Sequence, residues 1–369
     1  MRSCVRAERL QTFLTSLTSL THQTFLTFRT YATLPAMLLA LLSLVAGFVL
    51  LIKGANWLVE GASSIARRLK ISDLVIGLTV VSFGTSAPEL VVNIIASIQG
   101  NAAIAIGNVV GSNIANVLLI LGISAMIAPL AVQRSTVLKE IPFCLLASVV
   151  LFVMANDRLI DGYVISELGR GDGLAFMAFF VIFLYYTFGI RHVQEENHEE
   201  FTMPTQSVWF ALTLFFVGIG GLVIGAKLAV DGAVTIALAL GISESLIGLT
   251  VVAVGTSLPE LAASAVAAHK GKADIAVGNI VGSNIFNILW ILGLSSVIKP
   301  LPFQPALNFD LLIVILSTLF LFFIVHNGAA HKRLFLWWQQ QRDFIIRRWE
   351  GALLLIGYIA YIAYIGWRG

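Results

Sequence analysis

The feature that most constrains this chain is an internal repeat of 54 residues. Residues 77–130 and residues 248–301 match at 32 of 54 positions without a gap. The match is densest in two polar motifs, GTSxPEL and GNxVGSNIxN, whereas the Val, Ile and Ala residues between the motifs vary. A duplication that keeps hydroxyl, amide and carboxylate side chains while its apolar residues change indicates a preserved polar site as well as a pair of similar helices.

The composition places this polar site in a membrane protein. Apolar residues make up 58% of the chain and charged residues 12%, and the mean hydropathy is +0.91, outside the range of soluble globular proteins. A membrane span needs about 20 apolar residues. We predict an all-α polytopic membrane protein with ten transmembrane helices, at residues 37–65, 71–98, 103–130, 136–154, 173–190, 206–238, 242–268, 275–299, 307–326 and 349–367.

The repeat divides the chain into two halves of five spans each. Residue 248 follows residue 77 by 171 positions, and the same offset relates Gly54 to Gly225 further upstream. We expect a first five-helix repeat at 37–191, a cytoplasmic linker at 192–205 and a second five-helix repeat at 206–369. Because five is odd, the second repeat enters the bilayer from the opposite side, the inverted topology of many secondary transporters. The alternative, a duplication that only stabilises the bundle, does not explain the shared carboxylate.

Residues 1–36 differ in composition from the rest of the chain. They hold four arginines, one glutamate and many Ser and Thr residues, which suits a targeting segment. Met37, however, leads directly into the first apolar block. We interpret residues 1–36 as an N-terminal extension that is either a targeting segment or the product of an upstream translation start.

The distribution of basic residues predicts the orientation in the membrane. Most Lys and Arg residues follow odd-numbered spans, whereas the loops after even-numbered spans contain only Arg158, Arg170 and Lys299. Because cytoplasmic loops are enriched in Lys and Arg, we expect the odd-numbered loops in the cytoplasm and both termini outside, in the plasma or inner membrane. Cys4 and Cys144 lie far apart in the sequence, which predicts neither a disulfide framework nor a metal cluster.

Each repeat carries a Thr and a Glu four residues apart, Thr85 with Glu89 and Thr256 with Glu260. On a helix this spacing places both side chains on one face, where they can contact the same ion. The proline inside each motif cannot donate a backbone hydrogen bond to the carbonyl one turn earlier. We therefore expect a kink in both helices and freed carbonyl groups, which protein or an aqueous cavity must satisfy at membrane depth.

The following span of each repeat holds a Ser and an Asn at the same spacing, Ser112 with Asn116 and Ser283 with Asn287. The two repeats together offer carboxylate, hydroxyl and amide oxygens, with no thiolate or imidazole in the motifs. Such hard oxygen ligands suit Ca²⁺ or Na⁺ and argue against Zn²⁺ and Cu⁺.

The charge of the two glutamates predicts how such a site works. Two unit charges 4 Å apart repel by about 4 kcal/mol even at an effective dielectric constant of 20. A divalent cation, several Na⁺ ions or protons must therefore neutralise the pair before the site can close, and a carrier that crosses only when neutralised is an exchanger. Intramembrane acids are functional by default, which favours ion binding over a structural role for the pair.

At GTSAPEL, GTSLPEL and the two GSNIxN segments, the chain resembles the cation/calcium exchanger superfamily, in particular its Na⁺/Ca²⁺ exchanger branch and the short prokaryotic members of that branch. The resemblance covers residues 37–367. It implies that the two glutamates are the central ligands of the transported ions. The implied ligand set is Glu89, Glu260, Thr85, Thr256, Ser86, Ser257, Ser112, Ser283, Asn116 and Asn287, with backbone oxygens near Ser82 and Ala253.

The resemblance also implies secondary-active antiport of Ca²⁺ for Na⁺ by alternating access at one site near the membrane midplane. The expected partners are the two ions and the bilayer, with no nucleic acid and no cofactor, and the expected active form is a monomer. Some relatives carry Asp where this chain has Asn287, which leaves the number of bound Na⁺ ions and an accessory proton site open. The alternatives are H⁺/Ca²⁺ antiport and a cation channel. We expect no enzyme, because the motifs lack a paired nucleophile and base.

Overall fold

The computed structural model describes residues 34–189, 207–241, 253–327 and 344–368. In these residues the chain is helical apart from two small two-stranded sheets. Eight helices are long and apolar enough to cross a membrane, and a ninth candidate is the bent pair Asp73–Thr85 and Ala87–Gln99. The prediction of a polytopic helical membrane protein is therefore confirmed.

The described helices follow the predicted apolar blocks. Segments labelled η are π-helical, except η8, which is one turn of 3₁₀-helix. The elements are α2 (Leu34–Leu69), α3 (Asp73–Ile76), η1 (Gly77–Val81), α4 (Ser82–Thr85), α5 (Ala87–Gln99), α6 (Ala102–Ile114), η2 (Ala115–Ile120), α7 (Leu121–Ile127), β1 (Leu130–Val132), η3 (Thr136–Glu140), α8 (Ile141–Met154), α9 (Asp157–Ile160), β2 (Glu167–Leu168), α10 (Arg170–Gly189), α11 (Val208–Ala239), α13 (Ala253–Gly255), α14 (Leu258–His269), α15 (Ala273–Ile285), η7 (Phe286–Leu292), α16 (Gly293–Ile298), β3 (Leu301–Pro302), η8 (Pro305–Leu307), α17 (Asn308–Asn327), β4 (Phe344–Ile346) and α18 (Arg348–Arg368). The predicted linker at 192–205, most of the extension and the start of the seventh predicted span lie outside the described residues.

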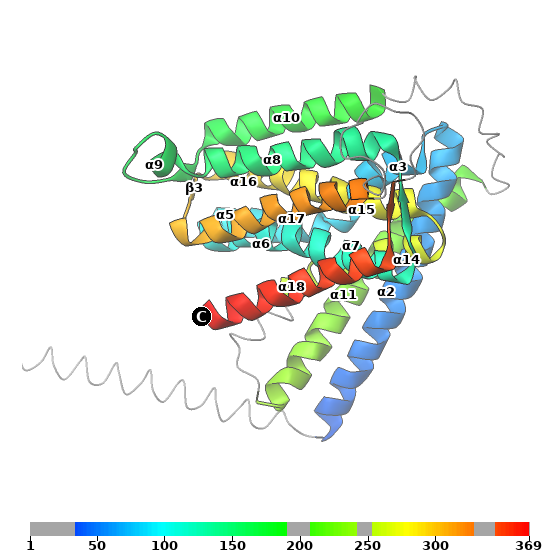
Figure 1. Ribbon diagram of the computed structural model, residues 1–369. Helices are drawn as coiled ribbons and strands as arrows, with labels where there is room; N and C mark the ends of the chain where they lie inside the picture. The colour runs from blue at the N-terminus through cyan, green and yellow to red at the C-terminus, as the bar shows by residue number, and fades with distance from the viewer. Residues whose placement is uncertain (1–33, 190–206, 242–252, 328–343, 369) are drawn as a thin grey trace, which may run out of the picture.

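Two long helices, α2 and α11, lie side by side and lean away from the other helices (Figure 1). They run antiparallel, and glycines at intervals of seven residues bring their backbones into contact. The glycines at this contact are Gly47, Gly54 and Gly61 of α2 and Gly218, Gly225 and Gly232 of α11. Small residues permit this approach inside a membrane, where packing replaces the hydrophobic effect between helices.

The contacts between α2 and α11 are reciprocal. A Cβ atom on Gly47 would lie 2.5 Å from the backbone nitrogen of Ala229, and a Cβ atom on Gly218 would lie 2.5 Å from the backbone nitrogen of Leu58. Gly218 and Ala229 follow Gly47 and Leu58 by the offset that relates the two repeats. The contact of Gly47 with Ala229 is therefore repeated by the contact of their repeat equivalents, Gly218 with Leu58. Such reciprocal contacts indicate a two-fold relation between the two helices.

Contacts between loops agree with the predicted assignment of loops to two sides of the membrane. The antiparallel pair of β1 and β4 joins the loops after the third and ninth predicted spans, and the pair of β2 and β3 joins those after the fourth and eighth. An ion pair of 2.8 Å between Lys272 and Asp73 joins the loop after the seventh predicted span to the start of the second span, next to the loop after the first. Each strand pair thus connects two odd-numbered loops or two even-numbered loops, and the ion pair agrees with this assignment.

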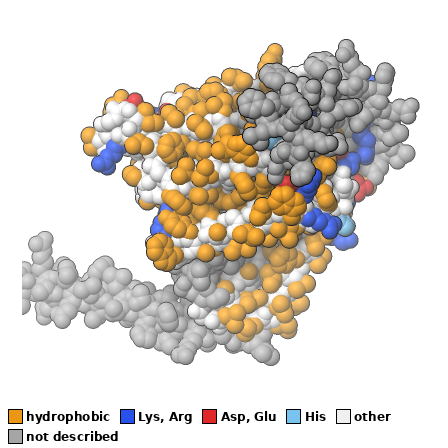
Figure 2. All heavy atoms as spheres, viewed as in Figure 1, with side chains coloured by type: hydrophobic (Ala, Val, Ile, Leu, Met, Phe, Trp, Pro, Cys, Tyr) orange, Lys and Arg blue, Asp and Glu red, His pale blue; other side chains and the backbone are white. Residues whose placement is uncertain are grey.

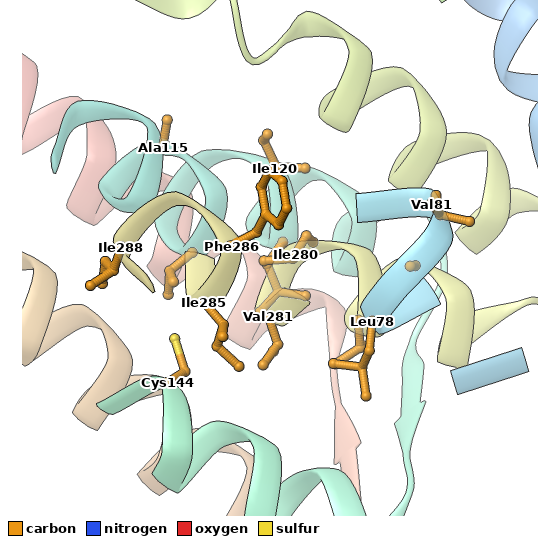
Figure 3. Close-up of a cluster of buried hydrophobic side chains, with 14 of the residues drawn as sticks. Leu78, Val81, Ala115, Ile120, Cys144, Ile280, Val281, Ile285, Phe286 and Ile288 are labelled. Atoms are coloured by element: carbon orange, nitrogen blue, oxygen red, sulfur yellow. The ribbon is translucent and has the colours of Figure 1, made fainter. Parts of the chain in front are cut away.

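The two spans that carry GNxVGSNIxN lie at the centre of the helix bundle. In an apolar stretch of these spans 72% and 94% of the residues are buried, compared with 17% to 44% in the other long candidate helices. Figure 3 shows the apolar part of this centre, where Ile280, Val281 and Ile285 of α15 lie between Leu78 of η1 and Cys144 of α8. On the face drawn in Figure 2, much of the described outer surface is apolar, as expected for helices that face lipid. The peripheral helices thus have the composition to separate the more buried central spans from lipid.

We predict that Gly54→Ala lowers the stability of the protein. The new Cβ atom would lie 2.8 Å from the backbone nitrogen of Leu222 and 2.9 Å from the carbonyl oxygen of Gly218, and overpacking of this kind costs about 1–3 kcal/mol. Gly220→Ala is the matched control on α11, because its Cβ atom meets no atom within 4 Å. The melting temperature in detergent should fall for Gly54→Ala only, and equal melting temperatures for both variants would contradict the proposed contact.

Candidate functional site

Both GTSxPEL motifs interrupt a helix. In the first repeat α4 ends at Thr85 and α5 begins at Ala87, and the helix is bent by 49° at this break. In the second repeat α13 ends at Gly255 and α14 begins at Leu258. Each proline lies at the start of the new helix, where its missing N–H group is not needed. The predicted kink is therefore a full break, and the proline starts a helix instead of bending a continuous one.

The two glutamates lie in the first turns of these new helices. Glu89 and Glu260 are each 1% exposed, and a helix N-terminus favours a negative side chain. Glu260 is the charged neighbour of Glu89, and Thr256 and Ser257 of the second repeat are its hydroxyl neighbours. The hydroxyl neighbours of Glu260 are the equivalent Thr85 and Ser86 of the first repeat, and Ser86 donates a hydrogen bond to it. Each carboxylate thus faces the hydroxyl groups of the other half.

Hydroxyl groups of the two repeats meet around the carboxylates. Ser86 Oγ donates a hydrogen bond of 2.8 Å to Glu260 Oε1 and lies 3.1 Å from Ser283 Oγ. The equivalent contact in the other half places Ser257 Oγ 3.4 Å from Ser112 Oγ. The predicted serine ligands are therefore close together and buried, although they come from four separate helical segments.

Several predicted ligands present oxygen atoms that no donor satisfies. Among the buried side-chain atoms without a hydrogen-bond partner in the described part of the chain are five such oxygens: Oε2 of Glu89 and Glu260, Oδ1 of Asn116 and Asn287, and Oγ1 of Thr256. An unsatisfied buried acceptor costs about 1–3 kcal/mol. A hard cation such as Ca²⁺ or Na⁺ binds oxygen ligands of these types, so this set fits the cations predicted from the sequence.

Three predicted ligands have different surroundings. Thr85 Oγ1 donates a hydrogen bond of 3.1 Å to Asn279 Oδ1, which ties Thr85 to α15. The carbonyl oxygen of Ser82 accepts a hydrogen bond of 3.0 Å from the Ser86 N–H group, so it keeps an ordinary helical partner. Ala253 is the first described residue after the gap at 242–252, and the role of its backbone oxygen stays a prediction.

Two features of this site were not predicted from the sequence. Asn113 and Asn284 join the two repeats by hydrogen bonds beside Asn116 and Asn287. Both residues occupy the same position of the two GSNIxN segments, and this repetition is the sequence signal that points to them. The second feature is that π-helical segments η2 and η7 begin one residue before Asn116 and Asn287. π-Helical turns are frequent at functional sites, but the motifs carry no local signal for them.

Comparisons with known proteins match both repeats of the chain. A family model described as sodium/calcium exchanger protein matches residues 39–189 and 210–367, which correspond to the two repeats. The sodium/calcium exchanger MaX1 of Methanosarcina acetivorans is 35% identical over 353 residues, which cover 87% of this chain and 97% of MaX1. Inner membrane protein YrbG of Escherichia coli is 37% identical over 281 residues, which cover 73% of this chain and 82% of YrbG.

A solved structure has the same fold. The sodium-calcium exchanger NCX_Mj, soaked with Na⁺ and without Ca²⁺, superimposes with a TM-score of 0.73 at 35% sequence identity. The alignment covers 89% of this chain and 99% of that structure. The similarity therefore extends over both repeats and is not restricted to the motifs.

Proposed function

This chain belongs to the sodium/calcium exchanger protein family, and we propose that it is a secondary-active antiporter that exchanges Ca²⁺ for Na⁺ across a membrane. The observation that carries the proposal is the pair of buried carboxylates, Glu89 and Glu260, one from each repeat. Two negative charges match one Ca²⁺ ion, or two of the Na⁺ ions that replace it.

Sodium is the counter-ion that the rest of the site supports. Asn287 offers an amide oxygen and no titratable group, so the only carboxylates in the predicted ligand set are the two glutamates. The remaining ligands are hydroxyl and amide oxygens, which bind Na⁺ without taking up protons. MaX1 and NCX_Mj are both named sodium/calcium exchangers. H⁺/Ca²⁺ antiport is the alternative that the transport experiment below distinguishes.

We further propose that ten spans form two inverted five-helix repeats around this site, and that the protein exchanges ions by alternating access as a monomer. The reciprocal contacts of α2 with α11 and of the site serines support a two-fold relation between the repeats. An inverted repeat gives two states of similar energy that open to opposite sides. With the observed bias of basic residues, both termini lie outside a plasma or inner membrane.

Charge-neutral substitution of either glutamate should abolish exchange. Glu89→Gln and Glu260→Gln each remove one of the charges that balance the divalent ion, and the symmetry of the site predicts equal losses. Glu167→Gln, in β2 and away from the site, is the control that should transport normally. The measurement is uptake of radioactive Ca²⁺ into proteoliposomes at equal protein content. More than about half of the wild-type flux in either site variant would overturn the shared-site proposal.

The choice of counter-ion is tested by the gradient that drives uptake. We expect an outward Na⁺ gradient to drive Ca²⁺ into proteoliposomes, and a pH gradient in Na⁺-free buffer to drive none, because Na⁺ and not H⁺ replaces Ca²⁺ at the two glutamates. Protein-free liposomes under both gradients are the control. Uptake that follows the pH gradient and ignores the Na⁺ gradient would assign H⁺/Ca²⁺ antiport instead.

The orientation is tested by labelling single cysteines in a background without the native ones. Lys70 and Arg158 are exposed and lie after the first and fourth predicted spans. Lys70→Cys should react with a membrane-impermeant reagent only from the cytoplasmic side, and Arg158→Cys only from the outside, because of the charge bias. Reaction of both from one side would refute the ten-span arrangement, and exchanged sides would reverse the topology.

A further inference from the structure

Four asparagines form a closed network where the central spans of the two repeats meet. Each of the four is 1% exposed. Asn116 Nδ2 donates a hydrogen bond of 2.9 Å to Asn284 Oδ1, and Asn287 Nδ2 donates one of 3.0 Å to Asn113 Oδ1. The side chains of Asn113 and Asn284 in turn donate bonds of 3.3 Å to each other's backbone carbonyl oxygens.

The backbone fixes the direction of every bond in this network. A carbonyl oxygen can only accept a hydrogen bond, so it requires Nδ2 of Asn284 to face Asn113. The other end of the Asn284 amide is then its oxygen, which can only accept, and Asn116 must present Nδ2 to it. The same steps, started from the carbonyl of Asn284, require Asn287 to present Nδ2 to Asn113. A rotation of any one amide would bring two acceptors or two donors face to face.

The consequence is that Asn116 and Asn287 turn their nitrogen atoms toward the network and leave their Oδ1 atoms without a donor. An amide oxygen is a ligand for Ca²⁺ or Na⁺, whereas the amide nitrogen is a donor with partial positive charge. The amide group has nearly the same shape after a rotation that exchanges Oδ1 and Nδ2. An Asn ligand therefore binds a cation only if a neighbouring residue holds Oδ1, and not Nδ2, toward the ion.

We propose that Asn113 and Asn284 are positioning residues that hold the amide oxygens of Asn287 and Asn116 toward the transported cation. This inference rests on the proposed function, because it assigns those two oxygens to the ion site. Asn113 acts on Asn287 and Asn284 acts on Asn116, so each repeat orients a ligand that belongs to the other repeat.

The first measurement is equilibrium binding of radioactive Ca²⁺ to the purified full-length protein in detergent and Na⁺-free buffer. Asn113→Leu keeps the backbone carbonyl that orients Asn284. It removes the acceptor of Asn287 and the bond that Asn113 donates to the backbone carbonyl of Asn284. Loss of a residue that orients a metal ligand typically weakens binding about 10- to 100-fold, and we expect a rise of at least about 10-fold in the Ca²⁺ dissociation constant. An unchanged dissociation constant would overturn the proposal.

The decisive measurement repeats Asn113→Leu in two further backgrounds. A carboxylate presents an oxygen in either orientation, so in an Asn287→Asp background Asn113→Leu should weaken binding less than about 2-fold, whereas in an Asn116→Asp background the loss of about 10-fold should persist. A purely structural role of Asn113 predicts the same loss in all backgrounds, and that result would refute orientation as the mechanism. If Asn113→Leu does not fold, the equivalent set uses Asn284→Leu, with Asn116→Asp as the suppressor.

A control for general destabilisation is available at a distance from the site. Asn156, which precedes α9, and Asn308, the first residue of α17, form another reciprocal amide pair with two hydrogen bonds of 2.8 Å. Asn308→Leu should leave the Ca²⁺ dissociation constant unchanged, and weakening equal to that of Asn113→Leu would overturn the proposal. The binding assay also separates the two proposals: wild-type protein that binds Ca²⁺ without Na⁺-driven exchange refutes the proposed function alone, and absence of Ca²⁺ binding refutes both.

Discussion

Two carboxylates enclosed in one membrane-buried site are the constraint on which the rest of the structure depends. The local structure offsets part of their repulsion, since both glutamates lie at helix N-termini and face hydroxyl groups. These groups carry only partial charges. In the described part of the chain, neither Glu89 nor Glu260 forms an ion pair with a basic side chain. In the proposed exchanger, the compensating charge therefore comes from cations. This need would couple the occupancy of the proposed site to its ability to close.

Duplication provides such a site with few residue types. Each repeat supplies one carboxylate on a broken helix and one Ser and Asn pair on the following span, and each depends on the other repeat to complete the set. The breaks are tolerated because the motif-bearing central spans are enclosed by more peripheral helices, so polar backbone at the breaks does not meet lipid. The glycine contacts of α2 with α11 obey the same offset, which extends the reciprocity beyond the site.

The sequence was sufficient for the features that a local pattern or the repeat itself encodes. Apolar block length predicted most helices, and the proline of each motif predicted a distortion at the position where the helix breaks. The spacing of Thr85 with Glu89 predicted one shared helix face, whereas the break separates the two residues. The sequence was insufficient where the outcome depends on packing between segments far apart in the chain. Thr85 is bonded to Asn279, 194 residues later, and the carbonyl of Ser82 keeps a helical partner. No helix propensity or spacing rule reports such contacts, and the π-helical register at Asn116 depends on packing in the same way.

In the proposed ion site, the asparagine network supplies an orientation that an amide ligand requires and a carboxylate ligand does not. Asp at position 287 would present oxygen in both orientations, but it would add a third negative charge to a site that two glutamates already make difficult to neutralise. Asn287 avoids that charge, and in exchange it depends on a neighbour that distinguishes oxygen from nitrogen. That neighbour is Asn113, and the backbone carbonyl of Asn284 sets the orientation of its amide. A backbone carbonyl remains a hydrogen-bond acceptor whatever side chain its residue carries. The orientation of the ligand therefore has its origin in the contact between the central helices of the two repeats.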